Sequence, residues 1–208
     1  MITITNILDC ESYLNQVDAV IFDLDDTLYS EKDYVRSGYA AVAQAFPQIL
    51  HMADKLWNAF EQKLPAIDVV LEDAGISTPE NKQKALQIYR NQKPVIAPYP
   101  GVHALLQRLG GEKKLGMITD GRPEGQWAKI ESLNLQPYFQ EIIVTDELGG
   151  VTFRKPNETA FCVMQKALSV PFEKMVYIGD NTRKDFIAPK KLGMQTIYFN
   201  NPDGLYTG

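Results

Sequence analysis

Five short hydrophobic runs along the chain end in turn-forming or polar residues, a pattern typical of β-strands. The runs are Val17–Asp23, Lys114–Thr119, Glu141–Thr145, Met175–Gly179 and Gln195–Phe199. Their apolar residues are largely continuous and do not alternate with polar ones. Because a strand covered on both faces needs apolar side chains on both sides, the runs predict parallel strands between two layers of helices.

Segments with helical spacing alternate with the last four of these strands. Val102–Leu109 places apolar residues at 102, 105, 106 and 109, and Gly110-Gly111 follows as a stop signal. Gln126–Leu133 and Asn157–Leu168 show similar spacing. This alternation of strand and helix predicts an α/β fold with a doubly wound, five-stranded parallel sheet.

One long stretch interrupts the alternation. Between Ser30 and Pro98 no strand is predicted, but four helical patterns occur: Tyr34–Phe46, His51–Leu64, Ile67–Asp73 and Asn81–Tyr89. About seventy residues between two strands is too long for a simple connection within a compact sheet. We therefore expect an α/β core formed by residues 1–30 and 99–208, with residues 31–98 inserted as a helical domain.

Composition and charge exclude several classes of protein. The 208 residues are 45% hydrophobic and 23% charged, which is ordinary for a packed globular chain, and no apolar run approaches the ~20 residues of a membrane span. The net charge of −5 and the lack of a basic tract argue against a nucleic-acid partner. The two cysteines, Cys10 and Cys162, form no CxxC pair, and the first residues do not resemble a signal peptide. We therefore expect free thiols and a cytoplasmic location.

Acidic residues follow the first predicted strand directly. Asp23 and Asp25 are two positions apart, so they point to the same side while the chain stays extended. Ligands of open α/β sheets bind outside the carboxyl ends of the strands. Two carboxylates held together there repel each other unless a cation or a proton lies between them.

Other polar residues follow the neighbouring strands. Thr119-Asp120-Gly121 ends the second strand, Gly179-Asp180 ends the fourth, and Asp185 follows five residues later. Lys155 precedes a predicted helix. Carboxylates without histidine or cysteine suit a hard cation such as Mg²⁺, while a lysine, a hydroxyl and free backbone N–H groups suit phosphate oxygens. The set predicts phosphoryl transfer through an aspartyl-phosphate, with a second carboxyl moving protons.

These residues resemble the haloacid dehalogenase (HAD) superfamily, in its phosphatase branch with a helical cap. The matching motifs occur in the order Asp23-Leu24-Asp25-Asp26-Thr27, then Thr119, then Lys155-Pro156, then Gly179-Asp180 with Asp185. Tyr99-Pro100-Gly101-Val102 is also typical of members that carry a cap. The resemblance covers about residues 17–199 and implies that the strands lie in the order 5-4-1-2-3.

The resemblance also implies a role for each matching residue. Asp23 is the expected nucleophile and a Mg²⁺ ligand, and Asp25 is the expected acid and base, with a backbone carbonyl that also binds Mg²⁺. Thr119 and Lys155 hold the phosphoryl group, with Asp120 and Gly121 beside it. Asp180 completes the metal site, and Asp185 supports it directly or through water. In the helix after Asp185, Pro189 is a departure that should kink or shorten that helix.

Asp25 separates two branches of this superfamily, because a dehalogenase needs no acid to protonate a departing halide. We therefore expect hydrolysis of a small phosphorylated metabolite, such as a sugar phosphate or a nucleotide-like monoester. A phosphosugar mutase, which shares the acid, is the alternative. A receiver domain has its acids, hydroxyl and lysine in another order, and a non-catalytic HAD-like protein would lack Asp23 or Asp25. The sequence does not define the oligomeric state. A monomer is weakly preferred.

Residues beside the motifs carry further expectations. Asp26 is expected to point away from Asp25 and to serve the turn. One of three residues at the start of the insertion, Tyr29, Arg36 and Tyr39, is expected to contact the substrate. Arg122 and Arg154 flank motif residues and are candidates for binding a second anionic group.

Overall fold

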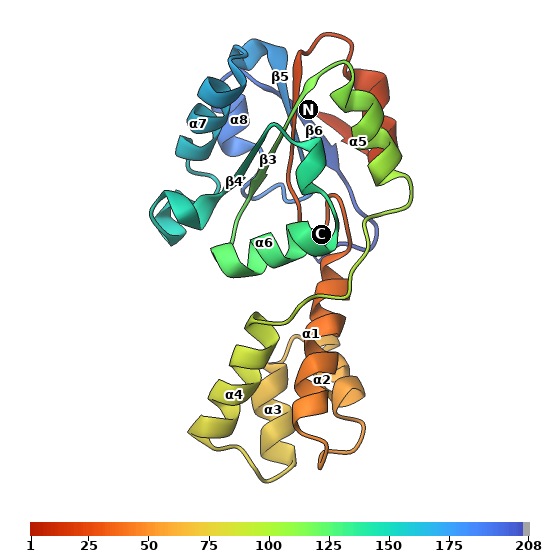
Figure 1. The fold of residues 1–208 in the computed structure, drawn as a ribbon, viewed down its shortest axis with the longest axis vertical. Coiled ribbons are helices and arrows are strands. Elements are labelled where there is room, and N and C mark those ends of the chain that lie inside the picture. Colours follow the sequence, from red (N-terminus) through yellow and green to blue (C-terminus); the bar gives the residue numbers. More distant parts are fainter. Residues whose placement is uncertain (206–208) are drawn as a thin grey trace. The chain divides into compact units, whose positions relative to one another are not determined.

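The structure is a computed structural model that describes residues 1–205. The chain forms two compact units, one of Met1–Glu31 with Ala97–Gly208 and the other of Lys32–Ile96. Strands and helices alternate in the first unit, and the second is entirely helical (Figure 1). No helix among the described residues is long and apolar enough to cross a membrane.

A six-stranded parallel sheet forms the centre of the first unit, in the order β1-β6-β5-β2-β3-β4. Its strands are β1 (Ile2–Ile4), β2 (Ala19–Phe22), β3 (Lys114–Thr119), β4 (Glu141–Val144), β5 (Met175–Gly179) and β6 (Gln195–Phe199). The predicted α/β fold with a parallel sheet is confirmed. The order of the five predicted strands also agrees with the structure.

The prediction of five strands was wrong by one, because β1 adds a strand at the edge beside β6. Ile2 pairs with Ile197 and Ile4 with Phe199. A run of three residues is too short to show a strand pattern, and its pairing with β6 depends on a segment nearly two hundred residues away in the sequence.

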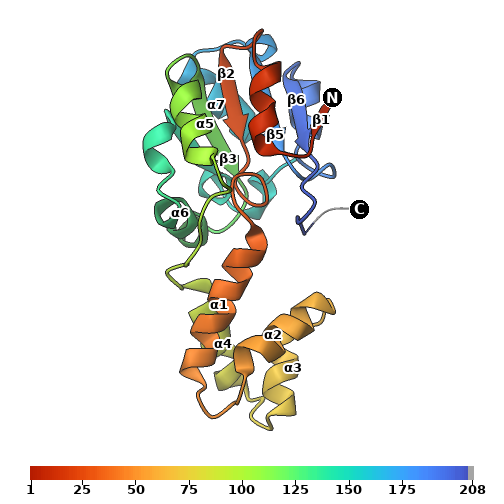
Figure 2. The ribbon, with the colours of Figure 1, turned by 90° about the vertical axis from the view of Figure 1, so that its right-hand side faces the viewer.

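Helices cover both faces of the sheet, as a doubly wound fold requires. α5 (Val102–Gly110) packs against β3, and α7 (Thr159–Leu168) packs against β3 and β4. Figures 1 and 2 show these two helices on opposite faces of the sheet. α6 (Pro123–Ser132) follows β3, and α8 (Ile187–Lys191), which contains Pro189, is only five residues long. The remaining turns of 3-10 helix are η1 (Ile7–Tyr13), η2 (Gln136–Tyr138), η3 (Thr145–Leu148), η4 (Val151–Phe153) and η5 (Phe172–Lys174).

The strand register brings the predicted chemistry to one edge of the sheet. Phe22 pairs with both Met117 and Ile178, so β2, β3 and β5 end at nearly the same level. Asp23 therefore follows β2 beside the ends of the other two strands, where ligands bind in open α/β sheets.

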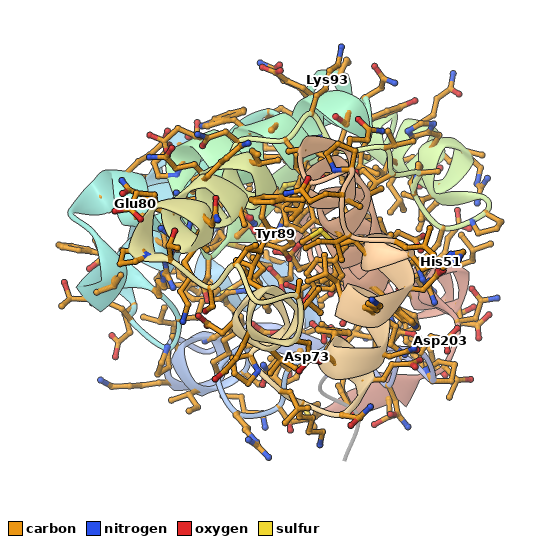
Figure 3. The ribbon with its side chains drawn as sticks, turned by 90° about the horizontal axis from the view of Figure 1, so that it is seen from below. His51, Asp73, Glu80, Tyr89, Lys93 and Asp203 are labelled. Carbon is orange, nitrogen blue, oxygen red and sulfur yellow. The ribbon has the colours of Figure 1, made fainter. Side chains whose placement is uncertain are left out.

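The second unit consists of four helices around their own apolar core. They are α1 (Glu31–Ala45), α2 (Met52–Glu61), α3 (Ala66–Asp73) and α4 (Pro79–Arg90). Val42, Leu56 and Leu71 are fully buried in this core. Tyr89 lies among these helices, 5.6 Å from the ring of Tyr39, whereas Glu80 and His51 lie on the outside (Figure 3).

Candidate active site

Asp23 stands at the end of β2 with its carboxylate buried. Its backbone N–H donates to the carbonyl of Ile178 at 2.8 Å, which extends the pairing of β2 and β5 by one residue. Only 3% of the residue is exposed. Burial raises the pKa of its carboxyl, and the negative charge of Asp185 adds to this, although Lys155 opposes both effects.

Lys155 is the cation at the centre of this site. Its Nζ lies 2.8 Å from Oδ1 of Asp23 and 2.8 Å from Oδ1 of Asp185, and it donates to the hydroxyl of Tyr177 at 2.7 Å. Burial by itself would lower the pKa of the ammonium, but Asp185 and Asp23 raise it well above its usual value. Lys155 is therefore a permanently charged group that holds two carboxylates in place.

Three of the predicted metal ligands lie together. One carboxylate oxygen from each of Asp23, Asp180 and Asp185 lies within 4.8 Å of the others, and all three residues are buried. Burial and the charges of Asp23 and Asp185 raise the pKa of Asp180. Among the described residues no lysine or arginine forms an ion pair with Asp180, whose carboxylate accepts only a long hydrogen bond, 3.5 Å, from Thr27.

This cluster fits a divalent metal ion. Three crowded carboxylates share one lysine, so a further positive charge would relieve their repulsion. An all-oxygen donor set suits Mg²⁺. The carboxylate of Asp25 is outside the cluster, so from Asp25 only the backbone carbonyl remains as the ligand that the sequence predicted.

Asp25 is held by three donors from two parts of the chain. Oδ1 accepts hydrogen bonds from the Tyr29 hydroxyl at 2.5 Å and from Nζ of Lys129 at 2.7 Å. Oδ2 accepts from the side-chain amide of Gln126 at 2.9 Å. Burial by itself would raise the pKa of Asp25, but the charge of Lys129 and these hydrogen bonds outweigh burial and lower it.

The residues at the end of β3 interact mainly with other protein groups. The hydroxyl of Thr119 is buried and accepts from the side chain of Gln126 at 2.5 Å. Oδ1 of Asp120 accepts from the backbone N–H of Lys155 at 3.0 Å, and Oδ2 forms an ion pair with Lys184 at 2.8 Å. Asp120 thus fixes the loop that carries Lys155. Gly121 has a φ of +148°, which favours glycine.

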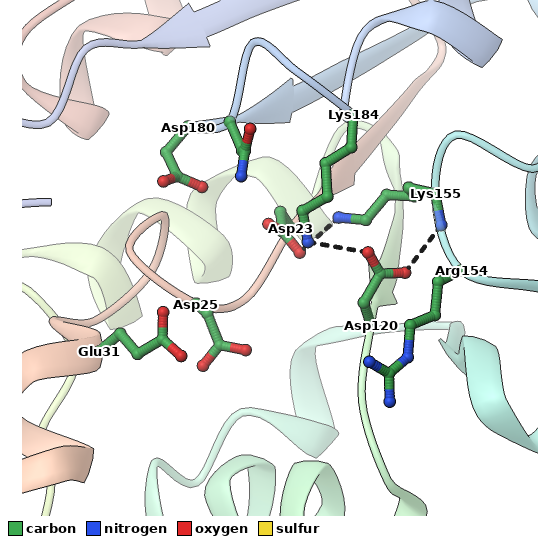
Figure 4. A pocket seen from close by; sticks show the side chains of 9 residues that line it. Asp23, Asp25, Glu31, Asp120, Arg154, Lys155, Asp180 and Lys184 are labelled. Atoms are coloured by element: carbon green, nitrogen blue, oxygen red, sulfur yellow. Dashed lines mark hydrogen bonds and ion pairs between the residues drawn. The ribbon is translucent and has the colours of Figure 1, made fainter. Parts of the chain in front are cut away.

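A cavity of about 350 Å³ opens over these groups. It is lined by Asp23, Asp25, Glu31, Asp120, Arg154, Lys155, Asp180, Asn181 and Lys184. Figure 4 shows Asp25, Glu31 and Asp180 on one side of Asp23 and the three cations on the other. Of the predicted site residues, three do not line the cavity: Asp185, Thr119 and Gly121.

Sequence reasoning missed several residues around this cavity. Lys129 and Gln126 on α6 contact Asp25, and Lys184 contacts Asp120. Glu31 lines the cavity, and burial beside Asp25 raises the pKa of its carboxyl. Only the closeness of Lys184 to Asp185 in the sequence was a usable signal. The other three residues lie on helices, where a polar residue does not by itself indicate a functional role: Gln126, Lys129 and Glu31.

The residues beside the sequence motifs lie in different surroundings. Asp26 serves the turn as expected, because its carboxylate accepts from the backbone N–H groups of Glu31 and Leu205. Tyr29 is fully buried against Asp25. Arg154 lines the cavity but makes two hydrogen bonds of 2.7 Å to Asp146, whereas Arg122 is exposed and outside the lining.

Comparison with known proteins agrees with this geometry. A family model described as haloacid dehalogenase-like hydrolase matches residues 20–199. A glyceraldehyde 3-phosphate phosphatase of Methanocaldococcus jannaschii is 28% identical over 87% of this chain and 84% of its own length. A 5-amino-6-(5-phospho-D-ribitylamino)uracil phosphatase of Escherichia coli is 23% identical over 92% of this chain and 87% of its own.

Solved structures share the fold. A HAD-superfamily hydrolase from Geobacter sulfurreducens superimposes with a TM-score of 0.66 at 17% identity, over 90% of this chain and 89% of that one. The relatives named as phosphatases agree with the prediction of a phosphoric monoester hydrolase. The family model spans both the strand ends that carry the acids and the helical insertion, which confirms the resemblance stated above. This chain belongs to the haloacid dehalogenase-like hydrolases.

Proposed function

We propose that this chain is a Mg²⁺-dependent phosphatase that hydrolyses a small phosphorylated metabolite through an aspartyl-phosphate on Asp23. The observation that carries the proposal is the position of Asp23, whose carboxylate lines a cavity, is paired with Lys155 at 2.8 Å and lies within 4.8 Å of Asp180 and Asp185. The relatives named as phosphatases support the same chemistry.

Asp23, Asp180 and the backbone carbonyl of Asp25 would hold Mg²⁺, with Asp185 behind them. The bound ion would neutralise phosphate charge, so that an anionic carboxylate can approach phosphorus. Lys155 would hold the phosphoryl group and keep Asp23 in place. It is suited to both tasks because it is fully charged and its position is fixed by Asp185 and Tyr177.

The reaction would proceed in two steps. An oxygen of Asp23 attacks phosphorus, the bond from phosphorus to the ester oxygen breaks, and Asp25 gives a proton to the departing alkoxide. Asp25 then takes a proton from water as that water attacks the aspartyl-phosphate, which frees Asp23 and releases phosphate. Lys129 favours the ionised form of the Asp25 carboxyl, which is the form that accepts a proton from water in the second step. Asp25 must therefore take up a proton before the first step, in which it protonates the alkoxide.

The size and charge of the cavity favour a small, polar substrate. A volume of about 350 Å³ lies at the lower end of the ~300–1,000 Å³ typical of small-molecule pockets, and every side chain that lines it is charged or polar. A sugar phosphate or a nucleotide-like monoester fits this description. We assign substrate selection to residues 31–98 as the cap domain.

A screen of phosphate esters tests the proposal. Glyceraldehyde 3-phosphate, other sugar phosphates and nucleoside monophosphates are incubated with the chain and Mg²⁺, and released phosphate is measured. We expect phosphate release that EDTA abolishes and added Mg²⁺ restores. Full activity in EDTA would refute the metal dependence. If ³¹P NMR instead shows a rearranged phosphosugar without phosphate release, the chain is a mutase.

A further inference from the structure

Gln126 joins two residues that sequence reasoning placed in the active site. Its Nε2 donates to Oδ2 of Asp25 at 2.9 Å and to the hydroxyl of Thr119 at 2.5 Å. A side-chain amide has two N–H donors on one nitrogen, so both bonds can form at once. Gln126 therefore connects the acid that follows β2 to the end of β3.

The surroundings of Gln126 keep this connection rigid. The residue is 4% exposed, so water cannot readily replace a lost hydrogen bond. It lies in the first turns of α6, which begins at Pro123 immediately after the loop that leaves β3. A Cβ atom at Gly121 would lie 3.0 Å from Cγ and Cδ of Gln126, so the glycine leaves room for this side chain.

Each partner of Gln126 gains a defined orientation. The hydroxyl of Thr119 accepts the bond from Gln126, so its own proton stays available for donation. The other oxygen of Asp25 is held by Tyr29 and Lys129. With Gln126 on Oδ2, both carboxylate oxygens are fixed, and rotation about the bond between Cβ and Cγ is blocked.

We infer that Gln126 is a positioning residue that sets the orientation of Asp25 for proton transfer to the leaving group. This inference rests on the proposed phosphatase function. Proton transfer requires the acid to lie within hydrogen-bonding reach of the ester oxygen, so a freely rotating carboxylate would slow this step. An alkoxide leaving group needs the proton, whereas p-nitrophenolate departs without it. Loss of Gln126 must therefore affect the two kinds of substrate unequally.

The test compares an alkyl phosphate that the enzyme hydrolyses with p-nitrophenyl phosphate. Gln126→Met retains the length of the side chain but removes both donors. We expect kcat/KM for the alkyl phosphate to fall about 10- to 100-fold, which is part of the ~10²–10⁴-fold that general acid–base catalysis contributes. For p-nitrophenyl phosphate kcat/KM, which reports only the steps up to formation of the aspartyl-phosphate, should fall less than about 3-fold, because the positioned acid is not needed there.

Gln165→Met is the matched control. Gln165 is also a helical glutamine, but its amide donates to the backbone carbonyl of Val170 at 3.1 Å and it does not line the cavity. For Gln165→Met the ratio of kcat/KM for the alkyl phosphate to kcat/KM for the aryl phosphate should equal that of the wild type. A purely structural role for Gln126 would lower both rates equally, and an unchanged ratio in Gln126→Met would overturn the inference.

Crystal structures of the wild type and Gln126→Met give a second readout that needs no turnover. The inference predicts that the carboxylate of Asp25 rotates in the variant, and an Asp25 rotamer identical to the wild type would overturn it. A wild type that hydrolyses no phosphate ester would refute the proposed function, and the crystal structures would still decide whether Gln126 positions Asp25.

Discussion

Nζ of Lys155 lies 2.8 Å from Oδ1 of Asp23, and both groups are almost completely removed from solvent. Burial of one charge alone would be very costly, so each makes the burial of the other possible. The same ammonium also neutralises Asp185. Among the described residues Asp180 has no such ion pair, so the cluster of three acids fits a metal ion.

Metal binding should stabilise the folded chain. Because Mg²⁺ would bind the Asp cluster only when the chain is folded, a concentration ~100-fold above Kd adds about 2.7 kcal/mol to the free energy of unfolding. We expect the thermal midpoint of the wild type to rise by several degrees, and that of Asp180→Asn to rise much less. Asp73→Asn, which changes an exposed acid at the end of α3, serves as the control and should keep the full shift. A full shift in Asp180→Asn would rule out this metal site.

The ion pair between Lys129 and Asp25 should contribute measurably to stability. The two side chains are 6% and 18% exposed, so Lys129→Met leaves a largely buried carboxylate without its cation. We expect a loss of about 2–4 kcal/mol in urea unfolding, near the lower end for a broken buried pair because Tyr29 and Gln126 remain as donors. Lys82→Met breaks an equally short pair with Asp68 that is 43% and 50% exposed, and should cost less than about 1 kcal/mol. Equal effects of the two substitutions would contradict this account.

The two thiols should differ in reactivity. Burial, with Glu11 and Asp9 nearby, raises the pKa of Cys10 to about 12, so its reactive thiolate is scarce at neutral pH. Cys162 on α7 is only partly buried. A thiol reagent such as DTNB should label one thiol in the native chain and two after unfolding. Cys162→Ser should remove the native reaction, and rapid labelling that persists in this variant would show that Cys10 is accessible.

The sequence was sufficient to predict most of the residues that line the cavity, but not the side chains that hold Asp25. Asp23 and Asp180 directly follow buried strands, and parallel strands end at a common edge, so their proximity followed from the pattern alone. Asp25 also follows β2, but its contacts with Gln126 and Lys129 depend on side chains about one hundred positions later in the sequence. The spacing of residues in the sequence does not indicate in which direction a long polar side chain points. The edge strand β1 was missed for a similar reason, because its three residues form a strand only by pairing with β6.

Replacement of the nucleophile should abolish turnover without unfolding the chain. Asp23→Asn is nearly isosteric but lacks the attacking carboxylate, so we expect kcat to fall ~10³-fold or more. Asp18→Asn, which changes the exposed residue immediately before β2, is the matched control and should retain wild-type activity. Circular dichroism would establish that both variants are folded. Substantial turnover by Asp23→Asn would show that another group attacks phosphorus.

The most direct test is to trap the covalent intermediate. The wild type is mixed with a ³²P-labelled substrate and Mg²⁺, quenched in acid within the first turnover, digested and analysed by mass spectrometry. We predict a label that hydroxylamine releases, as expected for an acyl phosphate, on the peptide that contains Asp23, and no label in Asp23→Asn. Turnover by the wild type with the label on another residue, or with no protein-bound label at any quench time, would contradict the aspartyl-phosphate on Asp23.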